Sequence, residues 1–185
     1  MNYKGANFVK RIAIDMDEVI SHFSAKCLEL FNDEFEERYT NQHLMGKKLM
    51  ELDSRFEKKV DQYLANESFF LELEVIKDSQ EIIKDLSASY EIYIVTAAME
   101  FPASLAPKYQ WLKKHFDFLN EKNFVFCGDK SIIHADYLID DTPSHLETFI
   151  GKGILFTAPH NVNATGYTRV NSWKEVKAYF DNLKE

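Results

Sequence analysis

The stretch Arg11-Ile12-Ala13-Ile14-Asp15-Met16-Asp17-Glu18-Val19 decides the fold of this chain. It opens with a short apolar run, which is typical of a strand buried on both faces of a parallel sheet. Two carboxylates, Asp15 and Asp17, follow the strand directly. In an extended turn both can point into one site, where their mutual repulsion favours a shared cation. Hard oxygen ligands of this kind suit Mg²⁺. Taken alone, the pair is equally consistent with the start of a helix, because aspartate is a good helix cap.

Four similar apolar runs follow along the chain, and helical patterns separate most of them. We expect strands at 92–95, 124–126, 137–139 and 154–156, and helices at 79–87, 107–118 and 172–183. Strands that alternate with helices imply a parallel sheet. The sequence therefore predicts an α/β fold, a Rossmann-like parallel sheet with helices on both faces.

Polar residues stand where these strands end. Thr96 ends the second strand, and Asp140 and Asp141 end the fourth. Ligands bind at the carboxyl ends of the strands in such sheets, so we expect these side chains and Asp15 to share one cleft. A turn closed by Thr142-Pro143 would also explain the second acidic pair, since Asp and Pro are common in turns. Two acidic pairs at the ends of two strands make a metal site the more economical explanation.

A long stretch separates the first two strands. Residues 24–75 contain many charged residues and have the apolar spacing of helices. A direct crossover between parallel strands can be far shorter, on the order of a dozen residues or more. We interpret the surplus as a small helical cap inserted over the strand ends. The core domain would then comprise residues 1–23 and 76–185. The alternative is a set of extra helices packed on the edge of the sheet.

Thr96 and two lysines complete a set that suits phosphoryl transfer. This reaction needs a nucleophile, a proton donor for the leaving oxygen, and cations around the transferred group. Thr96 can donate a hydrogen bond to a phosphate oxygen, and Lys108 or Lys130 can neutralise the phosphate charge. The residues alone do not choose between the two lysines, because most lysines are solvated surface charges.

The ordered set Asp15-x-Asp17, Thr96, a lysine and Asp140-Asp141 resembles the haloacid dehalogenase superfamily of phosphotransferases. The closer resemblance is to the 5'(3')-deoxyribonucleotidases, and it extends over most of the chain. The stretches that carry it are 15–23, Phe69-Phe70-Leu71-Glu72-Leu73-Glu74, Lys108-Tyr109-Gln110-Trp111-Leu112, 129–141 and Leu155-Phe156-Thr157-Ala158-Pro159-His160-Asn161. The resemblance implies a haloacid dehalogenase-like core and Mg²⁺-dependent hydrolysis of (deoxy)nucleoside monophosphates, small-molecule phosphomonoesters.

The same resemblance implies a role for each residue of the set. Asp15 would attack phosphorus and form an aspartyl-phosphate, and Asp17 would protonate the leaving oxygen and later activate water. Lys130 is the expected cationic partner of the phosphate. Further substrate contacts are expected from Thr96, from Lys108 and, beside the nucleoside, from Phe23. The expected metal ligands are Asp15, the backbone carbonyl of Asp17, and one of Asp140 or Asp141.

The chain departs from the family pattern at several positions. Glu18 stands where the family usually has glycine, and Ala97 stands where serine is common. Relatives use aromatic residues of the cap around the base, but here Leu64 occupies such a position, and Trp111 and Trp173 lie outside the cap. Two other readings therefore stay open: a phosphatase of the same superfamily acting on another small phosphate, and a non-catalytic phosphate-binding scaffold.

The whole chain sets broader limits. Its 185 residues suit one domain with a small insertion. A net charge of -8 argues against nucleic acid polymers and anionic membranes as partners. No apolar run is long enough to span a bilayer, and residues 1–10 lack the apolar region of a signal peptide. Cys27 and Cys127 are expected to be free, buried thiols. We therefore expect a cytoplasmic enzyme, and leave open whether it forms a homodimer.

Overall fold

The computed structural model describes residues 9–183. Six parallel strands form one sheet in the order β3-β2-β1-β4-β5-β6. The strands are β1 (Arg11–Ile14), β2 (Glu91–Thr96), β3 (Phe124–Phe126), β4 (Tyr137–Asp140), β5 (Lys152–Phe156) and β6 (Arg169–Val170). This is the strand order of doubly wound nucleotide-binding folds, in which the crevice lies where the order reverses. Here that point lies between β1 and β4, the two strands that the acidic pairs follow. The predicted α/β fold is confirmed.

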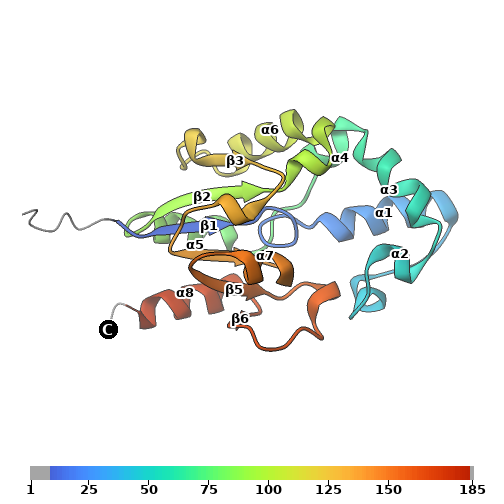
Figure 1. The fold of residues 1–185 in the computed structure, drawn as a ribbon. Coiled ribbons are helices and arrows are strands. Elements are labelled where there is room, and N and C mark those ends of the chain that lie inside the picture. The colour runs from blue at the N-terminus through green and yellow to red at the C-terminus, as the bar shows by residue number, and fades with distance from the viewer. Residues whose placement is uncertain (1–8, 184–185) are drawn as a thin grey trace, which may run out of the picture.

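Helices precede or follow most strands (Figure 1). They are α1 (Phe23–Phe35), α2 (Leu49–Leu52), α3 (Phe56–Leu64), α4 (Glu67–Leu71), α5 (Ser79–Ser87), α6 (Leu105–His115), α7 (Pro143–Thr148) and α8 (Trp173–Asn182). The predicted helix at 79–87 matches α5, and the other two predicted helices are shifted by up to three residues at their ends. Helix α7 and strand β6 were not predicted. The first opens at Pro143, which also suits a turn, and the second is too short to show a periodic pattern.

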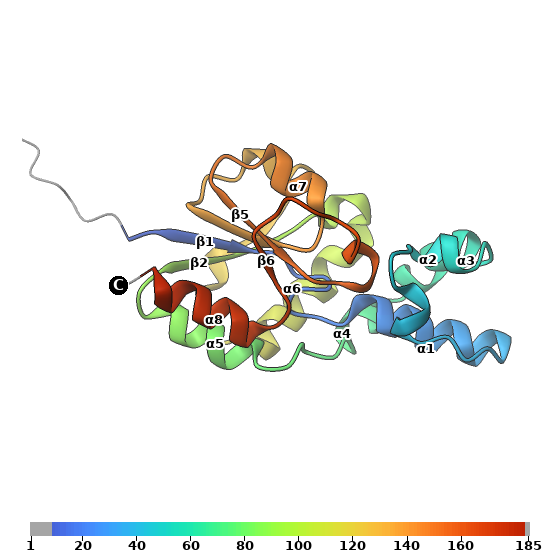
Figure 2. The ribbon, with the colours of Figure 1, turned by 90° about the horizontal axis from the view of Figure 1, so that it is seen from below.

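Two hydrophobic layers sandwich the sheet. Ile12 and Ile14 of β1 belong to the larger cluster, which also contains apolar residues of α5, α6 and α8. Ala13 points the opposite way and joins a smaller cluster with Leu146 of α7, because successive side chains of a strand face opposite sides. Figure 2 shows α7 on one side of the sheet and α5 and α8 on the other. Burial on both faces explains why the strands read as short apolar runs.

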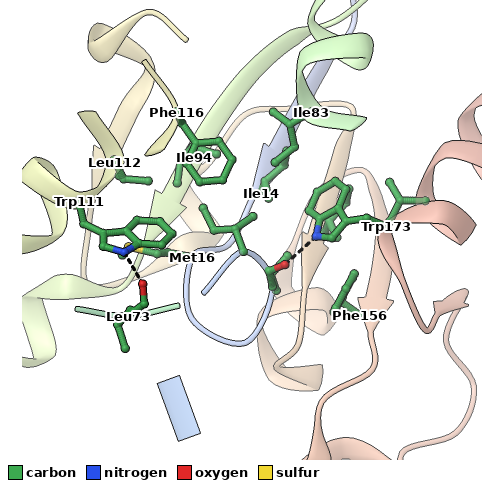
Figure 3. Close-up of a cluster of buried hydrophobic side chains, with 14 of the residues drawn as sticks. Ile14, Met16, Leu73, Ile83, Ile94, Trp111, Leu112, Phe116, Phe156 and Trp173 are labelled. Atoms are coloured by element: carbon green, nitrogen blue, oxygen red, sulfur yellow. Dashed lines mark hydrogen bonds between the residues drawn. The ribbon is translucent and has the colours of Figure 1, made fainter. Parts of the chain in front are cut away.

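Both tryptophans are fully buried in the larger cluster (Figure 3). Trp173 Nε1 donates a hydrogen bond to the carbonyl of Val19 at 2.8 Å, and Trp111 Nε1 donates one to the carbonyl of Leu73 at 2.8 Å. Val19 lies shortly before α1 and Leu73 lies just after α4. The core therefore anchors the backbone at both ends of the long helical stretch.

Helices α1, α2 and α3 extend beyond the sheet, on the side of the strands' carboxyl ends (Figures 1 and 2). The chain leaves and rejoins the core through two segments that lie side by side. Ser21 and Val75 form an isolated antiparallel bridge. His22 donates its backbone N–H to the carbonyl of Glu74, and Ile76 donates to that of Ile20, both at 2.9 Å. These contacts join residues 20–22, before α1, to residues 74–76, after α4.

The structure does not describe residues 1–8 or 184–185. The prediction that the N-terminus is not a signal peptide therefore falls mostly outside the described residues. Within residues 9–183, none of the helices has the length and apolar character needed to cross a membrane. Cys27 and Cys127 are free and buried, as predicted.

Candidate active site

Asp15 lies directly beyond β1, at the reversal point of the sheet. Its backbone N–H donates to the carbonyl of Ile139 at 2.9 Å, which ties the residue to the end of β4. The residue is 6% exposed. Burial raises the pKa of Asp15 to about 6, although the ammonium group of Lys130 opposes this shift. A carboxylate held in such a semi-dry position needs positive charge beside it to stay ionised.

Asp140 and Asp141 approach Asp15 from the end of β4. Carboxylate oxygens of these three residues lie within 4.8 Å of one another. Burial alone would raise the pKa of Asp140, but Lys130 and His145 hold it below its ordinary value. Burial raises the pKa of Asp141 well above its ordinary value, and the negative charges of Asp15 and Asp140 add to the shift. Lys130 opposes the rise in the pKa of Asp141 without cancelling it, so positive charge compensates Asp141 less than Asp140.

Lys130 and Lys108 bind different acidic groups. Lys130 Nζ lies 2.5 Å from Asp15 Oδ1 and 2.7 Å from Asp140 Oδ2. Lys108 Nζ lies 2.6 Å from Asp17 Oδ2 and donates to Thr96 Oγ1 at 3.0 Å. Both lysines are almost fully buried. Lysine is rarely buried without a partner, and these two are paired with carboxylates and are not solvated surface charges.

The site has the donor set for one hard divalent cation. Three carboxylates meet there, and Lys130 is the ammonium group that pairs with two of them. Asp17 lies outside this carboxylate cluster, and its Oδ1 is a buried acceptor without a hydrogen-bond partner among the described residues. Oxygen ligands with excess negative charge fit Mg²⁺ or a similar ion. The fit supports a divalent metal at this point.

The turn after Asp17 has the conformation that glycine would favour. Glu18 has a φ of 59°, in the left-handed region. Its carboxylate accepts a hydrogen bond from the backbone N–H of Ser24 in the first turn of α1. Glu18 therefore adopts a left-handed conformation without being glycine, and its side chain adds a contact to the first helix of the inserted stretch.

A cavity of about 560 Å³ opens above these groups. This lies within the range of about 300–1,000 Å³ typical of small-ligand sites. Asp15, Asp17, Lys108, Lys130 and Asp141 line it, together with Phe23, Phe70 and Phe101. Its outer wall comes from the inserted stretch and combines aliphatic side chains with two lysines: Leu44, Leu49, Val60, Leu64, Lys47 and Lys48. The structure thus brings most of the predicted site residues to one cavity. The two that do not line it contact its lysines: Asp140 is fully buried against Lys130, and Thr96 accepts a hydrogen bond from Lys108.

Sequence reasoning missed two features of this cavity. Phe101 lies in the loop after β2 and is 37% exposed, whereas Phe70 is 1% exposed. No periodic pattern marks a single aromatic residue in a loop. His160 lies in a stretch that carried the family resemblance, and its Nε2 stands 3.5 Å from Asp141 Oδ2. The tryptophans that lie outside the inserted stretch are core residues and do not line the cavity.

Comparison with known proteins identifies the family. The family model described as 5' nucleotidase, deoxy (pyrimidine), cytosolic type C protein matches residues 7–183. The chain belongs to this family. Among relatives of this nucleotidase family, a Staphylococcus epidermidis protein provisionally named 5'(3')-deoxyribonucleotidase is 45% identical over 176 residues, which cover 95% of this chain and 98% of the relative. The 5'(3')-deoxyribonucleotidase of Bacillus subtilis is 38% identical over 172 residues, covering 91% and 96%.

Solved structures agree with this family in their fold. A haloacid dehalogenase-like hydrolase from Streptococcus pneumoniae has a TM-score of 0.62 at 15% identity, covering 93% of this chain and 98% of that chain. A haloacid dehalogenase-type hydrolase from Bacillus subtilis, solved bound to magnesium, has a TM-score of 0.58 with the same identity and coverage. The predicted resemblance to the deoxyribonucleotidases is confirmed, and the chain is a phosphomonoester hydrolase. Its fold is that of haloacid dehalogenase-like hydrolases.

Proposed function

We propose that this nucleotidase-family enzyme hydrolyses (deoxy)nucleoside 5'- or 3'-monophosphates through covalent attack by Asp15, with Mg²⁺ as its cofactor. One observation carries the proposal: Asp15, Asp17 and Lys130 lie on the floor of a cavity whose walls hold aromatic and aliphatic side chains. The floor matches the needs of phosphoryl transfer, and the walls match those of a nucleoside. The names of the relatives support the same substrate class.

Asp15 and Asp17 would divide the chemistry between them. A carboxylate oxygen of Asp15 attacks phosphorus as the bond to the ribose oxygen breaks, and Asp17 gives that oxygen a proton. Asp17 then takes a proton from water, whose oxygen attacks phosphorus and releases inorganic phosphate and free Asp15. The 2.6 Å contact of Asp17 with Lys108 holds its carboxyl group in one orientation for both steps.

The proposed ligands of Mg²⁺ are Asp15, the backbone carbonyl of Asp17, and Asp141. Asp141 is favoured over Asp140 because both oxygens of Asp140 already accept hydrogen bonds, from Lys130 and from the backbone of Thr142. When bound, Mg²⁺ would neutralise charge on the phosphoryl oxygens and orient them for attack. Lys130, Lys108 and Thr96 would then bind the remaining phosphoryl oxygens.

The nucleoside would lie between the core and residues 24–75, which we propose to be a helical cap on a core formed by residues 1–23 and 76–185. The paired connections at Ser21 and Val75 support these limits. Phe101 offers an exposed aromatic ring to the cavity from the core side, and Phe23 lines the cavity from the start of α1. An aromatic ring can stack on any of the nucleobases. Free, buried thiols also suit the reducing cytoplasm that we expect for this enzyme.

A second candidate substrate is another small phosphate ester. The side chains of Leu44, Leu49, Val60 and Leu64 favour it, because these four aliphatic groups offer a base neither a hydrogen bond nor an aromatic ring. The chemistry on the floor of the cavity would be the same. Only the part of the substrate beyond the phosphate would differ.

Phosphate release from a panel of substrates tests both candidates. The panel holds 5'- and 3'-deoxyribonucleotides and ribonucleotides together with sugar phosphates, each with and without Mg²⁺. The control is Asp15→Asn, which keeps the size of the side chain but lacks its nucleophilic oxygen. We expect nucleoside monophosphates to be turned over best, and only with metal and Asp15 present. Faster turnover of sugar phosphates would support the second candidate, and no turnover by folded protein would favour a binding scaffold.

A further inference from the structure

Asn161 is a buried polar residue in the turn after β5, and the proposed mechanism does not use it. It ends the short 3-10 helix Pro159–Asn161 and is 2% exposed. Its Nδ2 donates to two carbonyl groups, that of Asp141 at 2.7 Å and that of Phe156 at 2.8 Å. Asp141 follows β4 directly and Phe156 ends β5. The amide therefore joins the ends of two neighbouring strands beyond their last paired residues, Asp140 and Leu155.

The orientation of this amide follows from its partners. Its Oδ1 accepts from the backbone N–H of Ala158 at 3.2 Å and from Nη1 of Arg169 at 3.0 Å. Both partners are obligatory donors, and both partners of Nδ2 are acceptors, so a flipped amide would lose all four bonds. Aspartate or leucine at this position could not reproduce the set.

Arg169 of β6 holds Asn161 in place. Besides its bond to Oδ1, the guanidinium donates through Nη2 to the carbonyls of Asn161 at 3.0 Å and Ala164 at 2.6 Å. Nη1 also donates to Thr157 Oγ1 at 3.0 Å. The rigid fork of an arginine suits such a set of acceptors. Strand β6, at the edge of the sheet, thereby holds the side chain of Asn161, which in turn donates to the backbone carbonyl of Asp141.

The carboxylate of Asp141 has weaker support of its own. Thr142 Oγ1 lies 3.4 Å from its Oδ1, and His160 Nε2 lies 3.5 Å from its Oδ2. Its backbone carbonyl, in contrast, accepts the 2.7 Å bond from Asn161. The backbone position therefore largely decides where this carboxylate lies relative to Asp15. We propose that Asn161 is a positioning residue for the metal, acting through the backbone of Asp141 and supported by Arg169. This inference rests on the proposed role of Asp141 as a metal ligand.

Metal binding without substrate tests the inference separately from activity. The probe is Mn²⁺, which takes the same oxygen ligands as Mg²⁺ and is measured by electron paramagnetic resonance. The variants are Asn161→Ala, which leaves room for water, and Arg169→Met, which leaves Asn161 in place without its support. The controls are Asn120→Ala at an exposed loop position and Val176→Ala in the core of α8. The melting temperature of each variant is measured alongside.

We expect Asn161→Ala to weaken Mn²⁺ binding on the order of tenfold, as is common for residues behind a metal ligand. Arg169→Met should weaken it less but in the same direction, and both controls should bind Mn²⁺ as the wild type does. Wild-type affinity in Asn161→Ala, with a lowered melting temperature like that of Val176→Ala, would overturn the inference. If Asn161→Ala does not fold, wild-type affinity for Mn²⁺ in Arg169→Met would overturn the inference instead. A wild type that binds no Mn²⁺ would overturn the proposed metal site as well.

Discussion

Glu18 combines an unfavourable backbone conformation with a useful side-chain contact. A left-handed backbone costs a non-glycine residue about 1–2 kcal/mol. Its carboxylate accepts from the N–H of Ser24, one of the first backbone donors of α1. His22, the N-cap residue of that helix, makes no side-chain capping bond. Glu18 thus supplies the acceptor that a cap residue usually provides, and links the turn of Asp15 and Asp17 to the proposed cap.

Two substitutions separate these effects. Glu18→Ala removes the acceptor and keeps a Cβ in the left-handed conformation, whereas Glu18→Gly removes the acceptor and relieves the backbone. We expect the free energy of unfolding of Glu18→Gly to exceed that of Glu18→Ala by about 1 kcal/mol. Urea denaturation of both variants measures the difference. Equal stability, or a more stable alanine variant, would show that this φ carries no energetic penalty.

Phe101 allows a test of the substrate that leaves the chemistry untouched. Stacking of a base on an aromatic ring contributes about 1–3 kcal/mol. Phe101→Ala should therefore raise KM for deoxynucleoside monophosphates by roughly tenfold, while KM for a sugar phosphate without a base stays near its wild-type value. The matched control is Met99→Ala, in the same loop but outside the cavity lining. A similar rise in KM for both substrates would contradict a stacking role.

At the scale of elements, the proposed cap is held at both of its connections by the core. Its two connecting segments pair with each other at Ser21 and Val75. A tryptophan of the core binds the backbone near each of them (Figure 3). Farther out, Gly46 of the proposed cap donates its N–H to the carbonyl of Pro159 at 2.8 Å, in the turn that contains Asn161. The stretch therefore meets the core at its ends and again at the far side of the cavity.

The two tryptophans form a matched pair for testing these anchors. Trp173→Phe and Trp111→Phe each leave one buried carbonyl without its donor, at Val19 or at Leu73. An unsatisfied buried acceptor costs about 1–3 kcal/mol, so both variants should lose at least that much stability in urea denaturation. Val19 lies in the loop that carries Asp15 and Asp17, so Trp173→Phe should also lower kcat more than Trp111→Phe does. Equal kcat in the two variants would argue that the loop is positioned by other contacts.

At the scale of the whole molecule, the active site concentrates negative charge in a chain whose net charge is already -8. Burial raises the pKa of Asp15 from 3.8 to about 6, and that of Asp141 also rises. Without metal, the folded state therefore keeps a proton on Asp15 between pH 3.8 and about 6, where the unfolded state has released it. The stability contributed by this proton is present at low pH and is lost as the pH rises through that window. Above it, charged carboxylates repel one another in the folded state.

Mg²⁺ should therefore raise the melting temperature more at pH 7.5 than at pH 5, where the metal must displace a proton. Metal at about 100 times its dissociation constant stabilises by about 2.7 kcal/mol, which corresponds to several degrees, at roughly 2–4 °C per kcal/mol, for a chain of this size. Thermal scans at the two pH values measure the shift. Asp141→Asn should abolish it, and should melt higher than the metal-free wild type at pH 7.5 because one repelling charge is gone. An equal shift at both pH values would contradict this account.

The amino-acid sequence was sufficient to predict the parallel sheet, the carboxylates at its strand ends and the family. Strands buried on both faces show as apolar runs, and Asp15-x-Asp17 and Asp140-Asp141 follow two of them directly, so these features are written in neighbouring residues. Tertiary structure alone decided that Lys130 pairs with Asp15 and Asp140 while Lys108 pairs with Asp17 and Thr96.

The same holds for β6, for the exposed ring of Phe101 and for the contact of Asn161 with Asp141. A two-residue strand has no period to detect, and a lysine, a phenylalanine or an asparagine shows no local mark of its partner. Those partners are brought together only when the strands align, because a parallel sheet places the ends of strands that are distant in sequence at one edge.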